Sequence, residues 1–257
     1  DITQADIQAY FNKYNFLAES NLKRHRMILR NIFDKAVYND LCRKNPVVGI
    51  VYLSTKDKTV RHAYTKEQAD KLIKYAKCHR DGTMIVIMLN TGVRRGELLG
   101  LKWVDIDYEN KTISVKRSVT PDTTEPKDGD VKSESSYRII PVSDEFLNYL
   151  KALPHKTDYI IPGKTKYGYL SIDAFEQRYK KFMEKACENL GIPYLVPHEL
   201  RHSFGTILRE NGVDIYTISH VMGHSDVVVT DKIYVHNDIN VLRKDMKLDK
   251  ESGTGVV

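Results

Sequence analysis

The stretch HELRHSFG, residues 198–205, decides the fold that we assign to the chain. Two histidines four residues apart on a helix, with a Glu between them, form the ligand pattern of zinc peptidases. Such a site needs a third protein ligand, and the candidates are Glu210, His220 and His224. Arg201 argues against this alternative, because a permanently charged guanidinium between the histidines raises the cost of binding a divalent cation.

A second interpretation pairs His198 with Arg201, three residues apart and so on one face of a helix. A histidine exchanges protons near neutral pH, and an arginine offers a planar fork of donors to phosphate oxygens. Other parts of a phosphate-handling site stand elsewhere in the chain. They are Arg94 in TGVRRGELLGLKW, His224 in MGHS and Tyr234 in IYVH.

Composition and charge describe an ordinary globular protein with room for one or two domains. The 257 residues are 41% hydrophobic and 29% charged, with a net charge of +6 that permits an anionic partner. The apolar runs fall short of the roughly 18 residues that a membrane helix needs. The three cysteines are widely spaced and odd in number, which favours a reducing cytoplasm over a disulfide framework.

Periodicity predicts a mainly α protein with a small antiparallel β-sheet. Apolar residues at helical spacing predict helices over residues 1–15 and 20–40, and Thr3 is a candidate N-cap for the first. Residues 111–118 and 135–142 alternate with period two and predict two strands. The charged stretch after the second helix suits a linker between two domains.

These blocks together resemble the tyrosine recombinase (phage integrase) family, whose pattern reads T-G-x-R-x-x-E-L, H-x-x-R-H, G-H and Y in that order. The resemblance covers residues 62–240 and is closest to the integrases of conjugative transposons. It implies an α+β catalytic domain over residues 62–240, after a helical core-binding domain over 1–54 and a linker over 55–61. Residues 241–257 would form a tail. Because the first domain matches only from its second helix onward, we expect an N-terminal truncation.

The resemblance also implies a role for each matched residue. Arg94 and Arg201 would neutralise charge that develops on a DNA phosphate, and Tyr234 would be the nucleophile that forms a 3′-phosphotyrosine. His198 would accept the tyrosine proton, and His224 would bond a phosphate oxygen. Because arginine and lysine supply the positive charge, we expect no metal ion. Because the covalent intermediate conserves the energy of the phosphodiester bond, we expect no ATP, and no other cofactor is expected.

The family's β-hairpin lysine box is similar to VKSESSYRIIP and nominates Lys132 as the group that protonates the departing 5′-oxygen. A valine stands where the family has a proline, and Lys127 remains the rival. Glu97 lies one helical turn after the first arginine and is expected to support it. His202 is expected to be structural and buried against neighbouring helices.

Basic residues concentrate in LKRHRMILR, within the second predicted helix. Lys23, Arg26 and Arg30 lie beside its apolar stripe, where they form either a solvated flank or a surface for duplex DNA. The resemblance favours DNA, with contacts to the backbone that would make binding steeply dependent on salt.

The function implied is that of a site-specific DNA recombinase, or integrase, that moves a mobile element in the bacterial cytoplasm. Its partners would be duplex DNA at the element ends and target, further copies forming dimers and a tetramer, and accessory DNA-bending or excision proteins. Two alternatives remain besides the zinc peptidase. A type IB topoisomerase shares the chemistry, but TGVRRGELLGLKW favours the recombinase, and an intact Tyr234 argues against a non-catalytic DNA-binding relic.

Overall fold

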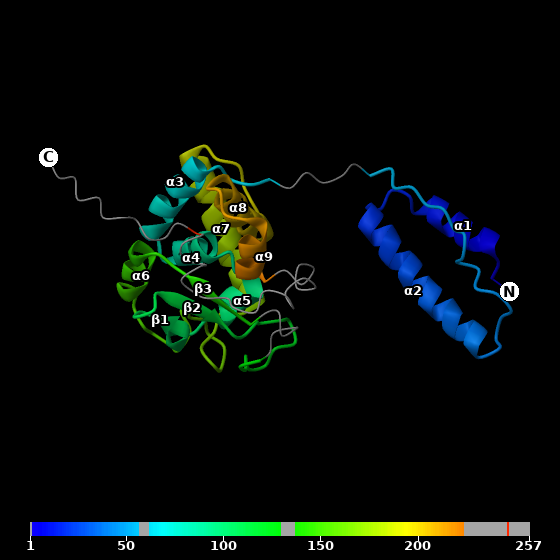
Figure 1. The fold of residues 1–257 in the computed structure, drawn as a ribbon, viewed down its shortest axis with the longest axis horizontal. Helices are drawn as coiled ribbons and strands as arrows, with labels where there is room; N and C mark the ends of the chain where they lie inside the picture. The colour runs from blue at the N-terminus through cyan, green and yellow to red at the C-terminus, as the bar shows by residue number, and fades with distance from the viewer. Residues whose placement is uncertain (1, 57–61, 130–136, 224–245, 247–257) are drawn as a thin grey trace. The chain divides into compact units, whose positions relative to one another are not determined.

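The computed structural model describes residues 2–56, 62–129, 137–223 and 246. The contacts within the chain divide it into two compact units, Asp1–Arg61 and His62–Val257 (Figure 1). We describe each unit by itself. The first is small and helical, and the second holds the sheet and the remaining helices.

The first unit consists of α1 (Gln4–Lys13), α2 (Glu19–Tyr38) and a non-helical segment that runs along them. Thr3 caps α1 as predicted, because its side chain accepts a hydrogen bond from the backbone N–H of Asp6. Gln8 ties the later segment to α1 by donating to the Val51 carbonyl at 2.6 Å. A small core holds the unit together and consists of Ile7, Phe11, Leu22, Val47 and Ile50.

The second unit is built around α4 (Thr83–Thr91), whose residues are all buried except Asn90, which is half-buried. This burial follows from the uninterrupted apolar sequence, since a helix that is hydrophobic all round belongs inside a core. α4 packs against α3 and α8. Among its described residues, the other α-helices of this unit are α3 (Lys66–Lys77), α5 (Arg95–Gly100), α6 (Asp144–Lys151), α7 (Ile172–Leu190), α8 (Pro197–Glu210) and α9 (Ile215–Met222), and two short 3-10 helices are η1 (Arg80–Gly82) and η2 (Trp103–Asp105).

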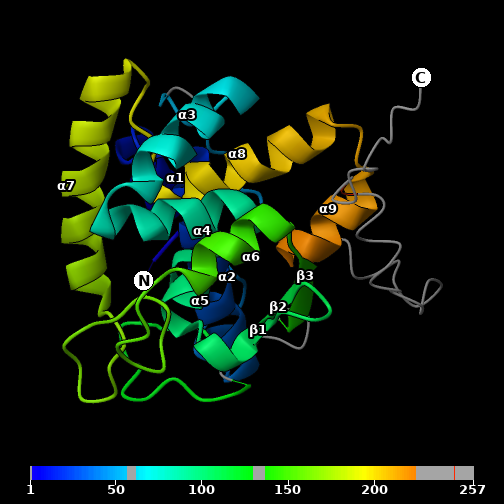
Figure 2. The same ribbon diagram turned by 90° about the vertical axis from the view of Figure 1, so that its left-hand side faces the viewer.

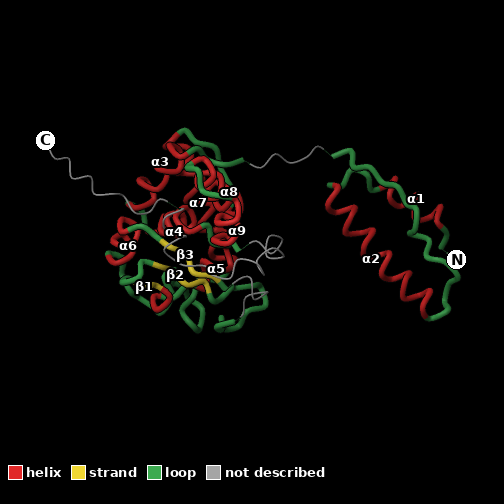
Figure 3. The backbone as a smooth tube through the Cα atoms, in the orientation of Figure 1, coloured by secondary structure: helices red, strands yellow, loops and turns green. Residues whose placement is uncertain are grey.

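In the part of the chain that the structure describes, the sheet has three antiparallel strands in the order β1 (Ile106–Asp107), β2 (Thr112–Val115) and β3 (Arg138–Pro141). It lies at the opposite end of the unit from α3 (Figures 1 and 2), and its strands are the yellow segments in Figure 3. β2 and β3 fall within the two predicted strand segments, whereas β1, only two residues long, was not predicted. The prediction of a mainly α fold with a small antiparallel sheet is confirmed.

Two features of this fold place the ends of α9 and α4. α9 packs against β3 as well as against α8, so the end of α9 lies beside the sheet. Gly92 ends α4 in the left-handed conformation, with φ of 62°, and turns the chain directly into α5. In the ranges that the structure covers, no helix is both long and apolar enough to cross a membrane.

Candidate active site

Arg94 is placed by the turn between α4 and α5. It adopts an extended conformation as the N-cap of α5, with φ of −71° and ψ of 157°. Glu97, three residues later, accepts a hydrogen bond from the Arg94 backbone N–H through Oε2 at 2.7 Å. This bond satisfies one of the donors that every helix start leaves without a partner. The spacing of Arg and Glu in TGVRRGEL is thus a helix-start motif as well as a pair of charges.

Glu97 is buried and binds two arginine side chains at once. Its Oε1 accepts from Nη1 of Arg94 at 2.8 Å and from Nη1 of Arg138 at 3.0 Å. Its Oε2 accepts from Nη2 of Arg138 at 2.8 Å. Burial raises the pKa of Glu97, but the bonds and charge of Arg138 and the bonds from Arg94 outweigh it and hold that pKa at about 2. The carboxylate is therefore ionised at neutral pH.

Arg201 lies on the buried side of α8 and is only 2% exposed. Its Nη1 donates to the Gly92 carbonyl at 2.6 Å, and its Nη2 donates to the Met222 carbonyl. Burial, together with the positive charges of Arg94 and Arg138, lowers the pKa of Arg201 to about 9, although the negative charge of Glu97 opposes this. The guanidinium is thus held between the end of α4 and the end of α9.

Three arginines bind three consecutive carbonyls at the C-terminal end of α9. Arg138 Nε donates to the Val221 carbonyl at 2.6 Å, and Arg94 Nη2 donates to the Gly223 carbonyl at 2.6 Å. Arg201 donates to the carbonyl between them, that of Met222. The last carbonyls of a helix have no partner within the helix and carry partial negative charge, so guanidinium groups stabilise them.

This arginine cluster, which we define as Arg94, Arg138, Arg201 and their shared carboxylate Glu97, carries a net positive charge. Arg138 and Arg201 are each 2% exposed, whereas the Arg94 side chain is 41% exposed. Arg94 is therefore the member that can reach a bound anion, such as a phosphate, with donors that are not directed at Glu97 or Gly223.

The Glu of HELRH has a structural use in α8. Glu199 Oε2 accepts from the Val196 backbone N–H at 3.0 Å, and Oε1 accepts from the His62 N–H at 3.4 Å.

The two histidines of HELRH, His198 and His202, are both exposed. The expectation that His202 is buried is wrong, because its position on α8 faces away from the packed side that holds Arg201. Within residues 2–56, 62–129, 137–223 and 246, no three His, Cys, Asp or Glu side chains form a group that could hold a metal ion.

Three of the predicted catalytic residues, Lys132, His224 and Tyr234, lie outside the described residues. The rival lysine, Lys127, is exposed and lines an open pocket, whose wall also includes Ser118, Thr120 and Tyr167. The neighbouring Asp128 accepts a hydrogen bond from buried Arg117 at 2.5 Å, which ties this connection between β2 and β3 to the core.

The three basic residues predicted to contact DNA differ in their surroundings on α2. Lys23 and Arg30 are exposed, and Arg30 forms an ion pair with Asp34 at 3.8 Å. Arg26 is half-buried, and its guanidinium lies over the Tyr52 ring at 5.9 Å from the ring centre. Lys23 and Arg30 are thus more available to a partner than Arg26.

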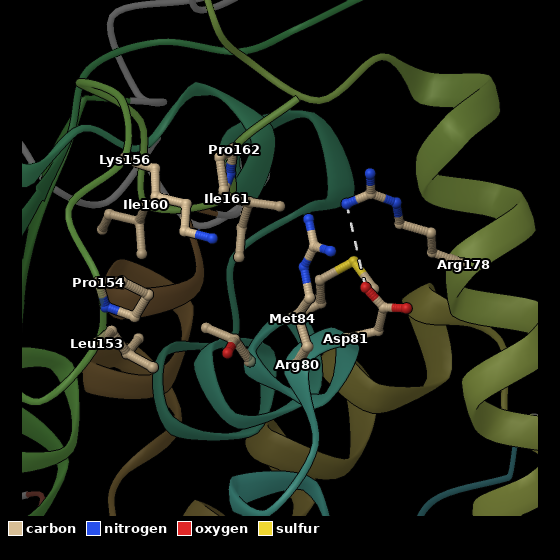
Figure 4. Close-up of a pocket in the computed structure, with 11 residues that line it drawn as sticks. Arg80, Asp81, Met84, Leu153, Pro154, Lys156, Ile160, Ile161, Pro162 and Arg178 are labelled. Carbon is tan, nitrogen blue, oxygen red and sulfur yellow. Dashed lines mark ion pairs between the residues drawn. The ribbon is translucent and has the colours of Figure 1, made fainter. Parts of the chain in front are cut away.

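A separate pocket of about 290 Å³ lies at the start of α4, the opposite end from Gly92. Its basic groups are Arg80, Lys156 and Arg178, and Arg178 pairs with Asp81 at 4.0 Å (Figure 4). The rest of its wall is mainly apolar. No member of the arginine cluster lines this pocket, so the two features are distinct.

Arg138 is the one described member of the cluster that the sequence did not single out. A signal was present, because Arg138 and Ile140 share one face of β3 and both are buried. An arginine at an inward strand position needs a buried carboxylate or carbonyls as partners. Glu97, already a candidate, was the partner to look for.

Comparison with known proteins identifies the family. The model of the phage integrase family matches residues 63–240. A XerC-like tyrosine recombinase from Caldanaerobacter subterraneus is 30% identical over 91% of this chain and 67% of its own length. The transposase from transposon Tn916 of Enterococcus faecalis is 26% identical over 93% of this chain and 64% of its own length. The chain thus spans about two thirds of the length of these relatives.

Solved structures show the same fold. The Tn1549 transposon integrase in complex with transposon right end DNA superposes with a TM-score of 0.72 at 22% identity, over 96% of this chain and 85% of that one. A lambda integrase dimer bound to a core site superposes with a TM-score of 0.59 at 22% identity, over 89% and 81% of the two chains. With the family match over most of the second unit, these findings show that the chain belongs to the phage integrase family of tyrosine recombinases.

Proposed function

We propose that this chain is a site-specific DNA recombinase that cleaves and rejoins strands through a covalent 3′-phosphotyrosine. The observation that carries the proposal is the arginine cluster, in which two family-motif arginines, 107 positions apart in the chain, meet at one end of α9. Family membership supports it, since the matched range includes Tyr234. The XerC-like relative supports a tyrosine recombinase activity, and the Tn916 transposase supports an action on mobile elements; the bacterial cytoplasm is the proposed compartment.

In this mechanism the Tyr234 hydroxyl attacks the phosphorus of a DNA phosphodiester, and its proton passes to His198. The bond from phosphorus to the 5′-oxygen breaks, and Lys132 gives that oxygen a proton. Arg94, Arg201 and His224 stabilise the charge on the non-bridging oxygens. The reverse reaction with the 5′-hydroxyl of another strand restores the phosphodiester bond, so the exchange needs no ATP.

The exposed arginine of the cluster suits this role. Arg94 presents its guanidinium to solvent, whereas Arg201 is held by two carbonyls and contributes its charge from a buried position. An arginine that is fixed before substrate binds stabilises transition-state charge without a cost for reorganisation. Glu97 fixes Arg94 through the backbone and the side chain together.

We also propose that duplex DNA at the element ends and target site is the partner. Lys23 and Arg30 on α2 are the proposed phosphate contacts in the first unit, and Arg26 is proposed as a contact through its position beside them. Two active sites are needed for each exchange step, so we propose dimers that pair into a tetramer on DNA, with accessory DNA-bending or excision proteins. The lambda integrase and Tn1549 structures, both DNA complexes, support this partner.

Neither alternative enzyme is supported. The XerC-like relative is a recombinase, and the Glu of HELRH is already engaged by two backbone N–H groups at the start of α8. A topoisomerase of type IB would relax supercoils as a monomer, whereas the proposed recombinase joins strands from two duplexes.

The test uses a nicked duplex that carries the boundary of the genetic element in which the gene lies. After cleavage the short 5′-hydroxyl fragment diffuses away, and the protein stays linked to the DNA in a denaturing gel. We expect this adduct with the wild type, with or without EDTA, and none with Tyr234→Phe, which should still shift the duplex in a native gel. An adduct with Tyr234→Phe, or loss of the wild-type adduct in EDTA, would refute the mechanism.

A further inference from the structure

Arg138 on β3 bridges the two parts of the cluster that the proposed cleavage needs. It holds Glu97 with both Nη atoms, at 3.0 and 2.8 Å, and the Val221 carbonyl with Nε, at 2.6 Å. It is 2% exposed, so it does not reach a DNA phosphate itself. Its hydrogen bonds to Glu97 and to the end of α9 give it two ways to influence the groups that do.

The carboxylate of Glu97 is fully occupied in this arrangement. An ionised carboxylate offers about four acceptor positions, two on each oxygen. Oε1 accepts from the side chains of Arg94 and Arg138, and Oε2 accepts from the Arg94 backbone and the Arg138 side chain. Arg138 thus takes half of the bonds and shares the negative charge, which limits Arg94 to a single side-chain bond with Glu97.

Removal of Arg138 would change what Glu97 does to Arg94. A buried carboxylate that loses two of its bonds is left with a large desolvation cost. The nearest group that can meet this need is the Arg94 guanidinium, already 2.8 Å away from Oε1. A bidentate pair of these two would neutralise Arg94 and turn its donors inward, away from the position of a phosphate.

The second contact of Arg138 is to the backbone that leads to His224. Val221, Met222 and Gly223 are the last described residues of this segment, and their carbonyls bind the three arginines in turn. Gly223 directly precedes His224 in the sequence. Arg138 therefore fixes the same stretch of backbone as Arg94 and Arg201 do, from the side of the sheet.

We propose that Arg138 is a positioning residue for strand cleavage: it shares Glu97 so that Arg94 remains available to the phosphate, and it anchors the end of α9. This inference rests on the proposed function. A positioning role for Arg138 can be distinguished from a merely structural role by one test. If Arg138 acts by restraining the charge of Glu97, then removal of that charge should partly restore an enzyme that lacks Arg138.

The experiment measures the single-turnover rate of adduct formation on the nicked duplex for the wild type, Arg138→Met and the double variant Arg138→Met with Glu97→Gln. By analogy with the loss of one preorganised donor, we expect Arg138→Met to be slower by about 10²-fold. Its affinity for DNA, from native gel titration, should stay within about 3-fold, because Arg138 does not contact DNA. The double variant should be about 10-fold faster than Arg138→Met, as expected for coupled neighbours.

The matched control is Arg117→Met. Arg117 is another buried arginine that binds a buried carboxylate, Asp105, with two bonds at 2.6 and 2.9 Å. It also donates to the Gly100 carbonyl and to Asp128, and no described hydrogen bond joins it to Glu97 or α9. Because Asp128 lies in the connection that leads to Lys132, this control is judged by rescue. Adding Glu97→Gln should not speed up Arg117→Met, since residues without shared partners do not couple. If Glu97→Gln rescued Arg117→Met as well as Arg138→Met, or if the Arg138 double variant were the slowest of the set, Arg138 would be structural and the inference wrong.

Circular dichroism at the assay temperature shows whether each variant is folded. If Arg138→Met is unfolded, Arg138→Lys decides the matter, because an ammonium keeps the charge but cannot bond Glu97 twice and Val221 once. We then expect adduct formation at least about 10-fold slower than in the wild type at unchanged DNA affinity. A wild-type rate for Arg138→Lys would overturn the inference, whereas absence of an adduct even with the wild-type protein would instead refute the proposed function.

Discussion

Glu97 gives the cluster a pH dependence that can be measured without DNA. Its pKa is about 2 in the folded protein against an ordinary value of 4.5, because the bonds from Arg138 and Arg94 outweigh the effect of burial. Since the folded-state pKa is the lower one, the unfolded chain binds the proton first as the pH falls. The stabilisation by the carboxylate is complete above pH 4.5 and is lost progressively toward pH 2.

The size of the effect follows from the two pKa values. Their difference corresponds to about 3 kcal/mol in total, of which about 2 kcal/mol is lost between pH 5 and pH 3. In Glu97→Gln this contribution is absent at every pH. We therefore expect the variant to be less stable than the wild type at pH 5, and the gap between them to shrink by about 2 kcal/mol at pH 3.

The assay is urea unfolding at pH 5, 4 and 3, followed by tryptophan fluorescence. Trp103 is the only tryptophan and lies in the second unit, where its ring stacks on His155 at a centroid distance of 3.8 Å. The signal thus reports the unit that contains Glu97. Glu145→Gln serves as the control, because Glu145 is an exposed carboxylate in the same unit. In this variant the free energy of unfolding should change with pH about as it does in the wild type. If the free energy of unfolding fell by the same amount from pH 5 to pH 3 in the wild type and in Glu97→Gln, the account of Glu97 would be refuted.

Three further predictions concern the other parts of the site. Arg201→Lys should slow adduct formation by about 10²-fold or more while the duplex still binds, because an ammonium keeps the charge but cannot replace two guanidinium nitrogens that bind separate carbonyls. Lys132→Ala should be defective on a normal duplex but recover on one with sulfur at the 5′-bridging position, where the leaving thiolate needs no proton; if Lys127→Ala behaves so instead, Lys127 is the acid. Lys23→Ala should reduce the slope of log affinity against log salt by about 1, and Arg26→Ala by less, which native gel titration at several salt concentrations checks.

The local elements were accessible from the sequence because their signals are local. Thr3 caps α1, and Gly191 ends α7 in the left-handed conformation, with φ of 63°, as its position after a helical pattern suggests. Period-two alternation located β2 and β3. β1 was not found, because two residues are too few to show a period.

The arrangement of the cluster was only partly accessible. The motifs named Arg94, Glu97 and Arg201, and the structure brings all three to the end of α9. The motifs did not indicate that the two arginines bind backbone carbonyls, since a carbonyl partner depends on tertiary packing and leaves no trace in residue identity. Arg138 stands at an inward position of β3, which calls for a buried partner, but the alternation of the strand does not show that this partner is Glu97. The bonds of Arg138 join β3 to α5 and α9, which are distant in sequence.

His202 was predicted to be buried, and this prediction was wrong because a sequence motif gives the spacing of residues but not the side of the helix that faces the core. Arg201, the adjacent residue, takes the buried position on α8, and consecutive helical residues point about 100° apart. An arginine on the packed face of α8 and a histidine on its exposed face reverse the usual preference, because arginine is rarely buried. Two hydrogen-bond acceptors, the carbonyls of Gly92 and Met222, and the nearby negative charge of Glu97 make this reversal possible.

The most direct measurement is the identity of the residue that becomes linked to DNA. The adduct from the nicked duplex is digested with trypsin and nuclease, and the nucleotide-bearing peptide is sequenced by mass spectrometry. The account predicts a single modified residue, Tyr234, joined to a 3′-phosphate, with a free 5′-hydroxyl on the released strand. A linkage to any other residue, or to a 5′-phosphate, would contradict it.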